Sequence, residues 1–195
     1  MSRVPDTAWP AELAADAQRV LTGWTAPTPA DEVARARVLE FVGDQGPAAA
    51  TRALRAGHLT ASAILLDAGH RQVLLTLHHL ARQWFQLGGH LEAGDAGLPA
   101  SALREATEES GIAGITVDPV PLGVDWHAVT CRDVDGVPRP SQHLDVTFLT
   151  VAPVGAQPQI SGESLDLRWF DVSDLPGSVD DPVRRCVAEA LRRLA

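Results

Sequence analysis

The sequence has little that would direct the chain to a membrane or to an oxidising compartment. Its only two cysteines, Cys131 and Cys186, lie far apart and outside any metal-ligand spacing. A reduced pair is therefore expected rather than a disulfide. No stretch approaches the roughly 20 apolar residues of a membrane span, and no basic segment followed by an apolar run marks a secretory signal. We expect a cytoplasmic protein without a membrane partner.

Positive charge is also scarce, and arginine carries all of it because lysine is absent. The 16 basic residues face 25 acidic ones, which gives a formal net charge of −9. That balance excludes the general basic surface by which proteins bind nucleic acid. Hydrophobic residues make up 45% of the 195 residues, which is usual for a globular chain with a sizeable core. A chain this acidic would need metal ions to handle a polyphosphate.

Three glutamates form the most informative pattern in the chain. Glu105, Glu108 and Glu109 stand at i, i+3 and i+4, so they share one face of a helix. Pro99 suits the first turn of that helix and Gly111 suits its C-terminal cap. Like charges at this spacing repel by roughly 0.2–0.5 kcal/mol per pair, a penalty that a cation would remove. Taken alone, the three residues could be a solvated acidic face, but Mg²⁺ prefers such oxygen ligands.

The surrounding residues make the pattern specific. It resembles the Nudix box, which is Gly, five residues, Glu, seven residues, Arg-Glu, an aliphatic, any residue, Glu-Glu, any residue, Gly and an aliphatic. One residue more than the family spacing separates Asp95 from Arg104, and Asp95 takes the place of the first Glu. The positions that match are Gly89, Asp95, Arg104, Glu105, Ala106, Glu108, Glu109, Gly111 and Ile112.

The resemblance implies a fold and an activity for residues 58–195. The fold is an α/β/α sandwich with a mixed sheet. The activity is metal-dependent hydrolysis of a pyrophosphate bond in a nucleoside diphosphate linked to another moiety. The box glutamates with the Gly88 carbonyl would bind Mg²⁺, with Mn²⁺ as an alternative ion, and Arg104 would pair with Asp95. In that family a glutamate before a Trp-bearing strand, here Glu163, serves as a further metal ligand or as the base; Glu105 is the other candidate base.

Four residues outside the box are candidates for substrate contact. His143 and Asp145 point to one side of a predicted strand, so both could line a pocket. His127 is a similar candidate, and Trp84 could stack on a base, although aromatic residues in strands are more often part of the core. No spacing among the histidines or cysteines predicts a zinc site.

Residues 1–57 are expected to be helical and to lie outside the family motif. They would pack on the catalytic domain or on a second subunit, which leaves a homodimer open, and a lid over the substrate is the alternative. Helices are predicted at 11–21, 29–43, 47–55 and 181–194, and strands at 59–66, 72–77, 84–87, 115–130, 143–151 and 166–170, with a hairpin joining the first two strands and a polar loop at 133–140.

Two other functions are compatible with parts of the pattern. A non-catalytic nucleotide-binding or regulatory module of the Nudix fold usually loses box glutamates, and this chain keeps them. An isomerase acting on isopentenyl diphosphate would require a cysteine in a different sequence motif, whereas Cys131 stands in Thr-Cys-Arg-Asp. Signatures of substrate-selective members are missing, so a nucleoside triphosphate or a small nucleotide sugar is expected by default.

Overall fold

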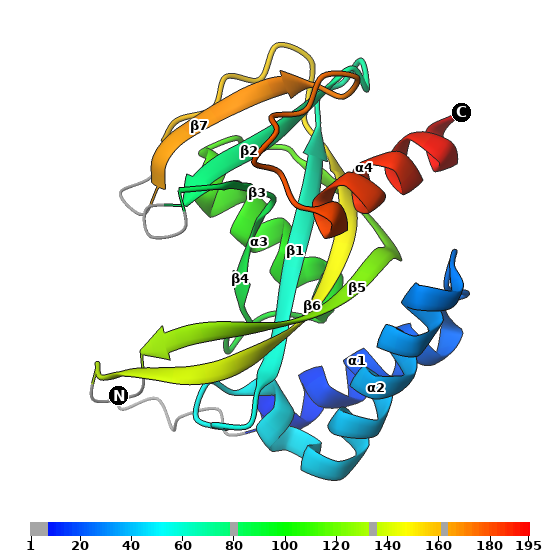
Figure 1. Cartoon of the computed structure of the whole chain (residues 1–195), viewed down its shortest axis with the longest axis vertical. Coiled ribbons are helices and arrows are strands. Elements are labelled where there is room, and N and C mark those ends of the chain that lie inside the picture. The colour runs from blue at the N-terminus through cyan, green and yellow to red at the C-terminus, as the bar shows by residue number, and fades with distance from the viewer. Residues whose placement is uncertain (1–7, 79–81, 133–135, 161–163) are drawn as a thin grey trace.

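The computed structural model describes residues 8–78, 82–132, 136–160 and 164–195, and Glu163 lies outside these ranges. A curled sheet runs through the molecule with helices on both faces (Figure 1). The helices are α1 (Trp9–Gly23), α2 (Pro29–Gln45), the 3-10 helix η1 (Gly46–Ala50), α3 (Leu98–Ser110) and α4 (Asp181–Leu194). The strands are β1 (His58–Leu66), β2 (Gln72–His78), β3 (Trp84–Phe85), β4 (Leu87–His90), β5 (Thr116–Arg132), β6 (Pro138–Val151) and β7 (Ser164–Asp171).

The sheet is mixed, as the sequence predicts. Its strands follow the order β3-β2-β1-β6-β5, with β4 paired to β1 and β7 paired to β2. The β1–β6 pair is parallel along the whole of β1, and the other pairs are antiparallel. Because β1 lies at the centre, it borders both the glycine-bearing strand β4 and the long strand β6. The predicted α/β/α sandwich is therefore confirmed.

Alternate residues of β1 face two different hydrophobic clusters, which accounts for its complete burial. Leu59, Ala61, Ala63 and Leu65 belong to the cluster on the α3 face, together with Leu98, Ala102 and Ala106. Ile64 and Leu66 belong to the cluster on the α4 face, together with Val183, Cys186, Val187 and Ala190. The two helices thus cover opposite faces of the same strand.

The N-terminal helices are part of the larger cluster. Their buried side chains pack with those of β1 and α3, and they are Leu13, Ala14, Ala17, Leu21, Val38 and Val42. Thr28 caps α2 by accepting a hydrogen bond from the Asp31 N–H at 3.1 Å. Packing on the rest of the chain, one of the two arrangements expected for this segment, is present. None of the described helices is long and apolar enough to cross a membrane.

Some predicted boundaries are wrong, and strand pairing explains why. The expected strand 84–87 is divided between two strands, β3 and β4. Strand β4 includes both glycines because residues 87–90 pair with β1. The third helix is shorter than expected, a single 3-10 segment. Strand β6 begins at Pro138 rather than 143, since its first residues pair with the end of β5. The hairpin of β1 and β2 is paired only near its turn, where Leu65 and Leu66 meet β2.

Candidate active site

Two glycines in β4 allow unusually close approach of neighbouring groups. Gly88 has φ 155°, and a Cβ there would lie 2.3 Å from the Ser62 hydroxyl oxygen on β1. A Cβ on Gly89 would lie 2.6 Å from Oε1 of Glu105. The missing side chains therefore let β4 pair with β1 on one side and let the Glu105 carboxylate rest on the backbone at Gly89.

Helix α3 presents the glutamates to this backbone, and its limits follow from local sequence. Pro99 lies in its first turn. Gly111 ends it in the left-handed conformation (φ 66°), and its N–H donates to the Thr107 carbonyl at 2.9 Å. Both predictions for the ends of the helix are confirmed. Glu108 is exposed and Glu109 is half-buried, so the carboxylates of one helix face extend from the Gly89 backbone to the solvent.

Arg104 holds the loop before α3 and the first two glutamates together. Its Nε donates to Asp95 Oδ1 at 2.9 Å and its Nη2 to Oδ2 at 3.2 Å, so the ion pair expected from the sequence is present. Nη1 donates to Glu105 Oε1 at 2.9 Å and to Glu108 Oε2 at 3.0 Å. Nη2 also donates to the His90 carbonyl at 2.8 Å, which ties the guanidinium to the end of β4. One planar cation thus fixes the relative positions of these groups.

The ionisation of Glu105 and Asp95 follows from these contacts. Burial raises the pKa of Glu105 above its ordinary value, and the nearby Arg104 guanidinium only partly opposes this. Burial acts in the same direction on Asp95, but hydrogen bonds from Arg104 and from the Glu92 N–H (2.9 Å) hold the pKa of Asp95 below its usual range. Asp95 is therefore a fixed anion that anchors Arg104.

The donor set on this face suits a hard divalent cation. Glu105, Glu108 and Glu109 offer only oxygen, the ligand type that Mg²⁺ and Mn²⁺ prefer. Gly89 leaves space for the Glu105 carboxylate beside the backbone, and the predicted ligand Gly88 is its immediate neighbour in β4. The residues present fit the ion that the sequence implies, and their roles as ligands remain predictions.

Asp145, a predicted substrate contact, is 2% exposed and lies under a group of hydroxyls. It accepts hydrogen bonds from Thr60 Oγ1 and Ser62 Oγ, both at 2.8 Å, and from Thr147 Oγ1 at 3.2 Å. The Gln86 side-chain amide adds a longer contact at 3.4 Å. Burial raises the pKa of Asp145, and the hydroxyl donors oppose the shift. The carboxylate is thus surrounded by side chains of the protein itself.

The other predicted substrate contacts separate into two places. His127 pairs with Asp125 (Nδ1–Oδ2 2.6 Å), which raises the pKa of the imidazole, and its ring lies 5.6 Å from that of His143. Trp84 instead packs edge-to-face on Phe170, with ring centroids 4.7 Å apart, within the cluster on the α4 face. The structure brings His127 and His143 together and places Trp84 in an aromatic pair with β7.

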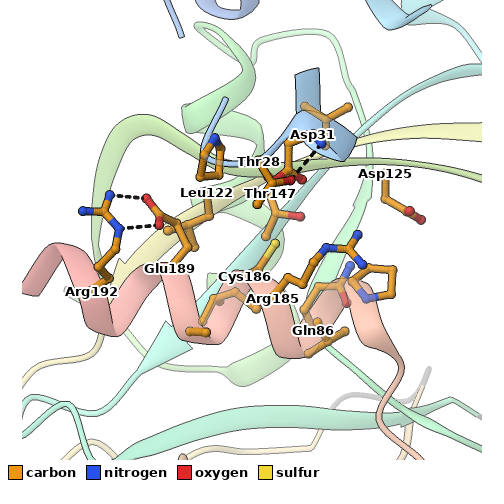
Figure 2. A pocket seen from close by; sticks show the side chains of 17 residues that line it. Thr28, Asp31, Gln86, Leu122, Asp125, Thr147, Arg185, Cys186, Glu189 and Arg192 are labelled. Carbon is orange, nitrogen blue, oxygen red and sulfur yellow. Dashed lines mark hydrogen bonds and ion pairs between the residues drawn. The ribbon is translucent and has the colours of Figure 1, made fainter. Parts of the chain in front are cut away.

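A cavity of about 260 Å³ lies between α4 and the sheet (Figure 2). Asp125 and Thr147 contribute polar groups from the sheet, Gln86 contributes one from the link between β3 and β4, and Cys186 and Glu189 line the cavity from α4. The buried Oε1 of Gln86 has no hydrogen-bond partner among the residues that the structure describes. Sequence analysis did not single out Gln86, although its place two residues before the paired glycines is a local signal for it.

A second group that the sequence did not combine gathers around His143. One ligand atom from each of His58, His90, Cys131 and His143 lies within 4.8 Å of all the others. The residues come from four different strands. His58 and His143 are brought together because β1 and β6 are parallel neighbours in which these two residues are directly paired. No spacing along the chain could indicate this convergence, since strand register alone creates it.

Comparison with known families agrees with this arrangement. Residues 57–193, well over half of the sequence, match the model of the NUDIX domain. The chain belongs to the Nudix family. This membership confirms the sequence prediction of a Nudix-type hydrolase. No curated protein sequence matches the chain.

Solved structures show the same fold at low sequence identity. A Nudix-family hydrolase from Clostridium perfringens has a TM-score of 0.51 and 24% identity, over 71% of this chain and 98% of that one. The Ap4A hydrolase of C. elegans, solved as a binary complex, has a TM-score of 0.54 and 18% identity, over 70% and 96%. The dihydroneopterin triphosphate pyrophosphohydrolase of E. coli has a TM-score of 0.54 and 16% identity, over 72% and 99%. The family model leaves residues 1–56, which hold the N-terminal helices, unmatched.

Proposed function

We propose that this Nudix protein is a metal-dependent hydrolase of a pyrophosphate bond in a nucleoside diphosphate linked to another moiety. The observation that carries the proposal is the Arg104-centred arrangement, in which Glu105 lies against Gly89 while Glu108 extends from the same guanidinium. A non-catalytic module would have no need to keep three carboxylates on one helix face at an electrostatic cost. The intact face therefore supports catalysis.

The residues of the box divide the work of such a reaction. Glu105, Glu108, Glu109 and the Gly88 carbonyl would hold Mg²⁺ against the substrate diphosphate. When bound, the ion supplies charge neutralisation and a lowered pKa of the attacking water. Glu105 or Glu163 would accept the proton of that water. Arg104, anchored by Asp95, keeps Glu105 oriented toward β4 and prevents the carboxylates from moving apart.

The cavity between α4 and the sheet is a candidate binding place for the nucleoside part of the substrate. Gln86, two residues before Gly88, lines this cavity and has a buried carbonyl oxygen without a hydrogen-bond partner among the described residues. A base edge with an N–H donor would satisfy that oxygen, since buried polar groups are normally hydrogen-bonded. Asp125, which lines the same cavity, is a further polar group and pairs with His127.

The test is a substrate screen with the full-length chain. Nucleoside triphosphates and nucleotide sugars come first, and diadenosine tetraphosphate and dihydroneopterin triphosphate are included because two structural neighbours are named for them. Each is incubated with Mg²⁺, with Mn²⁺ or with chelator, and products are identified by mass so that the broken bond is known. We expect that the P–O–P bond is hydrolysed and that this hydrolysis depends on the divalent ion.

The matched variants are Glu108→Gln and Glu40→Gln, both at exposed helix positions. Glu108→Gln should keep the fold and lower turnover by several orders of magnitude, since it removes a charged ligand but little volume. Glu40→Gln on α2 should turn over at the wild-type rate. Near-normal turnover of Glu108→Gln at saturating Mg²⁺ would rule out the ligand role. Nucleotide binding without any hydrolysis would favour the non-catalytic module.

A further inference from the structure

Three imidazoles and one thiol, all possible metal ligands, lie close together in the sheet. His58 begins β1, His90 ends β4, Cys131 lies near the end of β5, and His143 lies in β6. The imidazole centroids are 5.0 Å (His58–His90), 5.0 Å (His58–His143) and 5.2 Å (His90–His143) apart. The Cys131 sulfur lies 3.3 Å from Nε2 of His143. We propose that these four residues bind one Zn²⁺ ion in a four-coordinate site.

The distances between the four ligand atoms are only slightly longer than those in a tetrahedral zinc site. With Zn–N bonds of about 2.0–2.1 Å and a Zn–S bond of about 2.3 Å, tetrahedral ligand atoms are about 3.3–3.6 Å apart. The four ligand atoms already lie within 4.8 Å of one another. Rotation of the side chains by about 1 Å at their tips closes the remaining gap. The backbone need not move, because β1, β4, β5 and β6 are already paired in one sheet.

Buried ring nitrogens of His58 and His90 lack hydrogen-bond partners among the described residues. His58 is 1% exposed, and neither of its ring nitrogens makes a hydrogen bond of normal geometry to the described parts of the chain. The same holds for the buried Nε2 of His90. A buried polar atom without a partner costs on the order of 1–3 kcal/mol. Coordination of one ion would remove that cost at one His58 nitrogen and at His90 Nε2.

Burial disfavours the charged form of the imidazoles in the cluster. Burial, followed by the neighbouring histidines, lowers the pKa of His143 to about 3, and burial, then His58, lowers that of His90 to about 4. Neutral imidazole is the state that donates a lone pair to a metal. Burial raises the pKa of the Cys131 thiol, while the charge of Arg52 opposes that shift and favours the thiolate.

The ligand types separate this site from the carboxylate face of α3. Nitrogen and sulfur donors suit Zn²⁺, whereas Mg²⁺ binds oxygen. Four protein ligands leave no open position, which is the pattern of a structural site. The carbonyl of His90 accepts the Arg104 hydrogen bond, so the ion would brace the strand end from which the box loop departs. The proposal does not depend on the substrate or on the catalytic rate.

The experiment measures metal content in the full-length chain, produced with Zn²⁺ and purified without a polyhistidine tag. After dialysis against metal-free buffer, elemental analysis should find about one zinc per chain, as expected for one closed site. Cys131→Ser and His143→Gln should each lose most of it. His127→Gln, whose ring neighbours His143, and His70→Asn in the β1–β2 turn are the matched controls and should keep the zinc.

A second measurement does not require that any variant fold. Cobalt bound to the wild-type chain in place of zinc should show the intense visible bands of a tetrahedral site and a thiolate-to-cobalt charge-transfer band. The charge-transfer band must be absent from Cys131→Ser if that protein folds. Zinc content that is equal in wild type and Cys131→Ser, or a cobalt spectrum of octahedral type, would overturn the proposal. Both results would mean that the ion sits on oxygen ligands elsewhere or that the cluster is a neutral histidine group.

Discussion

Asp16 on α1 caps the helix that carries the box: its Oδ2 accepts a hydrogen bond from the Leu98 N–H at 2.8 Å. Helix α3 has no side-chain cap of its own, because Gly97 stands at its N-cap position. Gly97 has φ 157°, and a Cβ there would lie 2.7 Å from Asp16 Oδ2. A carboxylate 82 positions away in the sequence thus takes the place of the missing cap. It also lies at the positive end of the α3 dipole.

The first prediction follows from that contact. Asp16→Ala should lower the free energy of unfolding by about 0.5–2 kcal/mol, the usual value of an N-cap, because the Leu98 N–H loses its acceptor in a buried place. Asp44→Ala, at an exposed position of α2, is the control. Denaturant unfolding gives the magnitude, and amide exchange should localise the loosening to the first turn of α3. Equal losses for both variants would show that Asp16 is not a cap in solution.

The second prediction concerns the whole N-terminal segment. A chain that starts at Gly57 should be poorly soluble or unstable, because it exposes the face of the core that Leu13, Leu21 and Val42 cover and removes the cap on α3. Expression yield and thermal unfolding measure this. A stable truncated chain with an unchanged turnover number and a sharply raised Michaelis constant would instead support the lid hypothesis.

The third prediction addresses Glu163, which lies outside the described residues. If Glu163 is the base, Glu163→Gln should lower the rate by about 10²–10⁴-fold with little change in the Mg²⁺ requirement. If it is a metal ligand, the Mg²⁺ concentration for half-maximal rate should rise instead. Titrating Mg²⁺ against turnover for Glu163→Gln beside Glu105→Gln separates the two. We expect the larger effect on rate; an unchanged rate would leave Glu105 as the candidate base.

The fourth prediction is a pH dependence at the end of α4. Glu189 accepts hydrogen bonds from Arg192 (2.7 Å) and Arg193 (2.9 Å), and the Arg192 bond, with help from Arg193, holds the pKa of Glu189 below its ordinary value. A lowered pKa in the folded state stabilises the fold above the unfolded pKa of about 4.3, and the contribution is lost as pH falls through the folded value. It should therefore be complete at pH 7.

The measurement compares wild type with Glu189→Gln from pH 7 to pH 3. The variant should be less stable by about 1–3 kcal/mol at pH 7, the value of hydrogen bonds to a charged group, and the difference should shrink as the pH falls below about 4. Glu40→Gln should show no such convergence, because Glu40 is exposed on α2. A difference that stays constant with pH would mean that packing, not ionisation, accounts for the effect of Glu189.

Local sequence determined the elements whose hydrogen bonds are local. Helix α3 was predictable because its carboxylates recur within one turn, and because Pro99 and Gly111 have backbone preferences that act at their own positions. The same holds for α4, whose cap at Asp180 accepts from the Val183 N–H at 3.1 Å. The pair of Arg104 with Asp95 was also predictable, since the two residues lie nine positions apart and belong to the same box pattern.

Tertiary structure alone decided the contacts between distant strands and helices. The burial of Asp145 under Thr60, 85 positions away, and the meeting of His58 with His143 both depend on the register of β1 against β6. A strand's own sequence shows which residues share a face but not which strand lies beside it, because register is set by packing across the whole sheet. The cap that Asp16 provides for α3 has the same origin: α1 reaches Leu98 only after both helices have packed on one core.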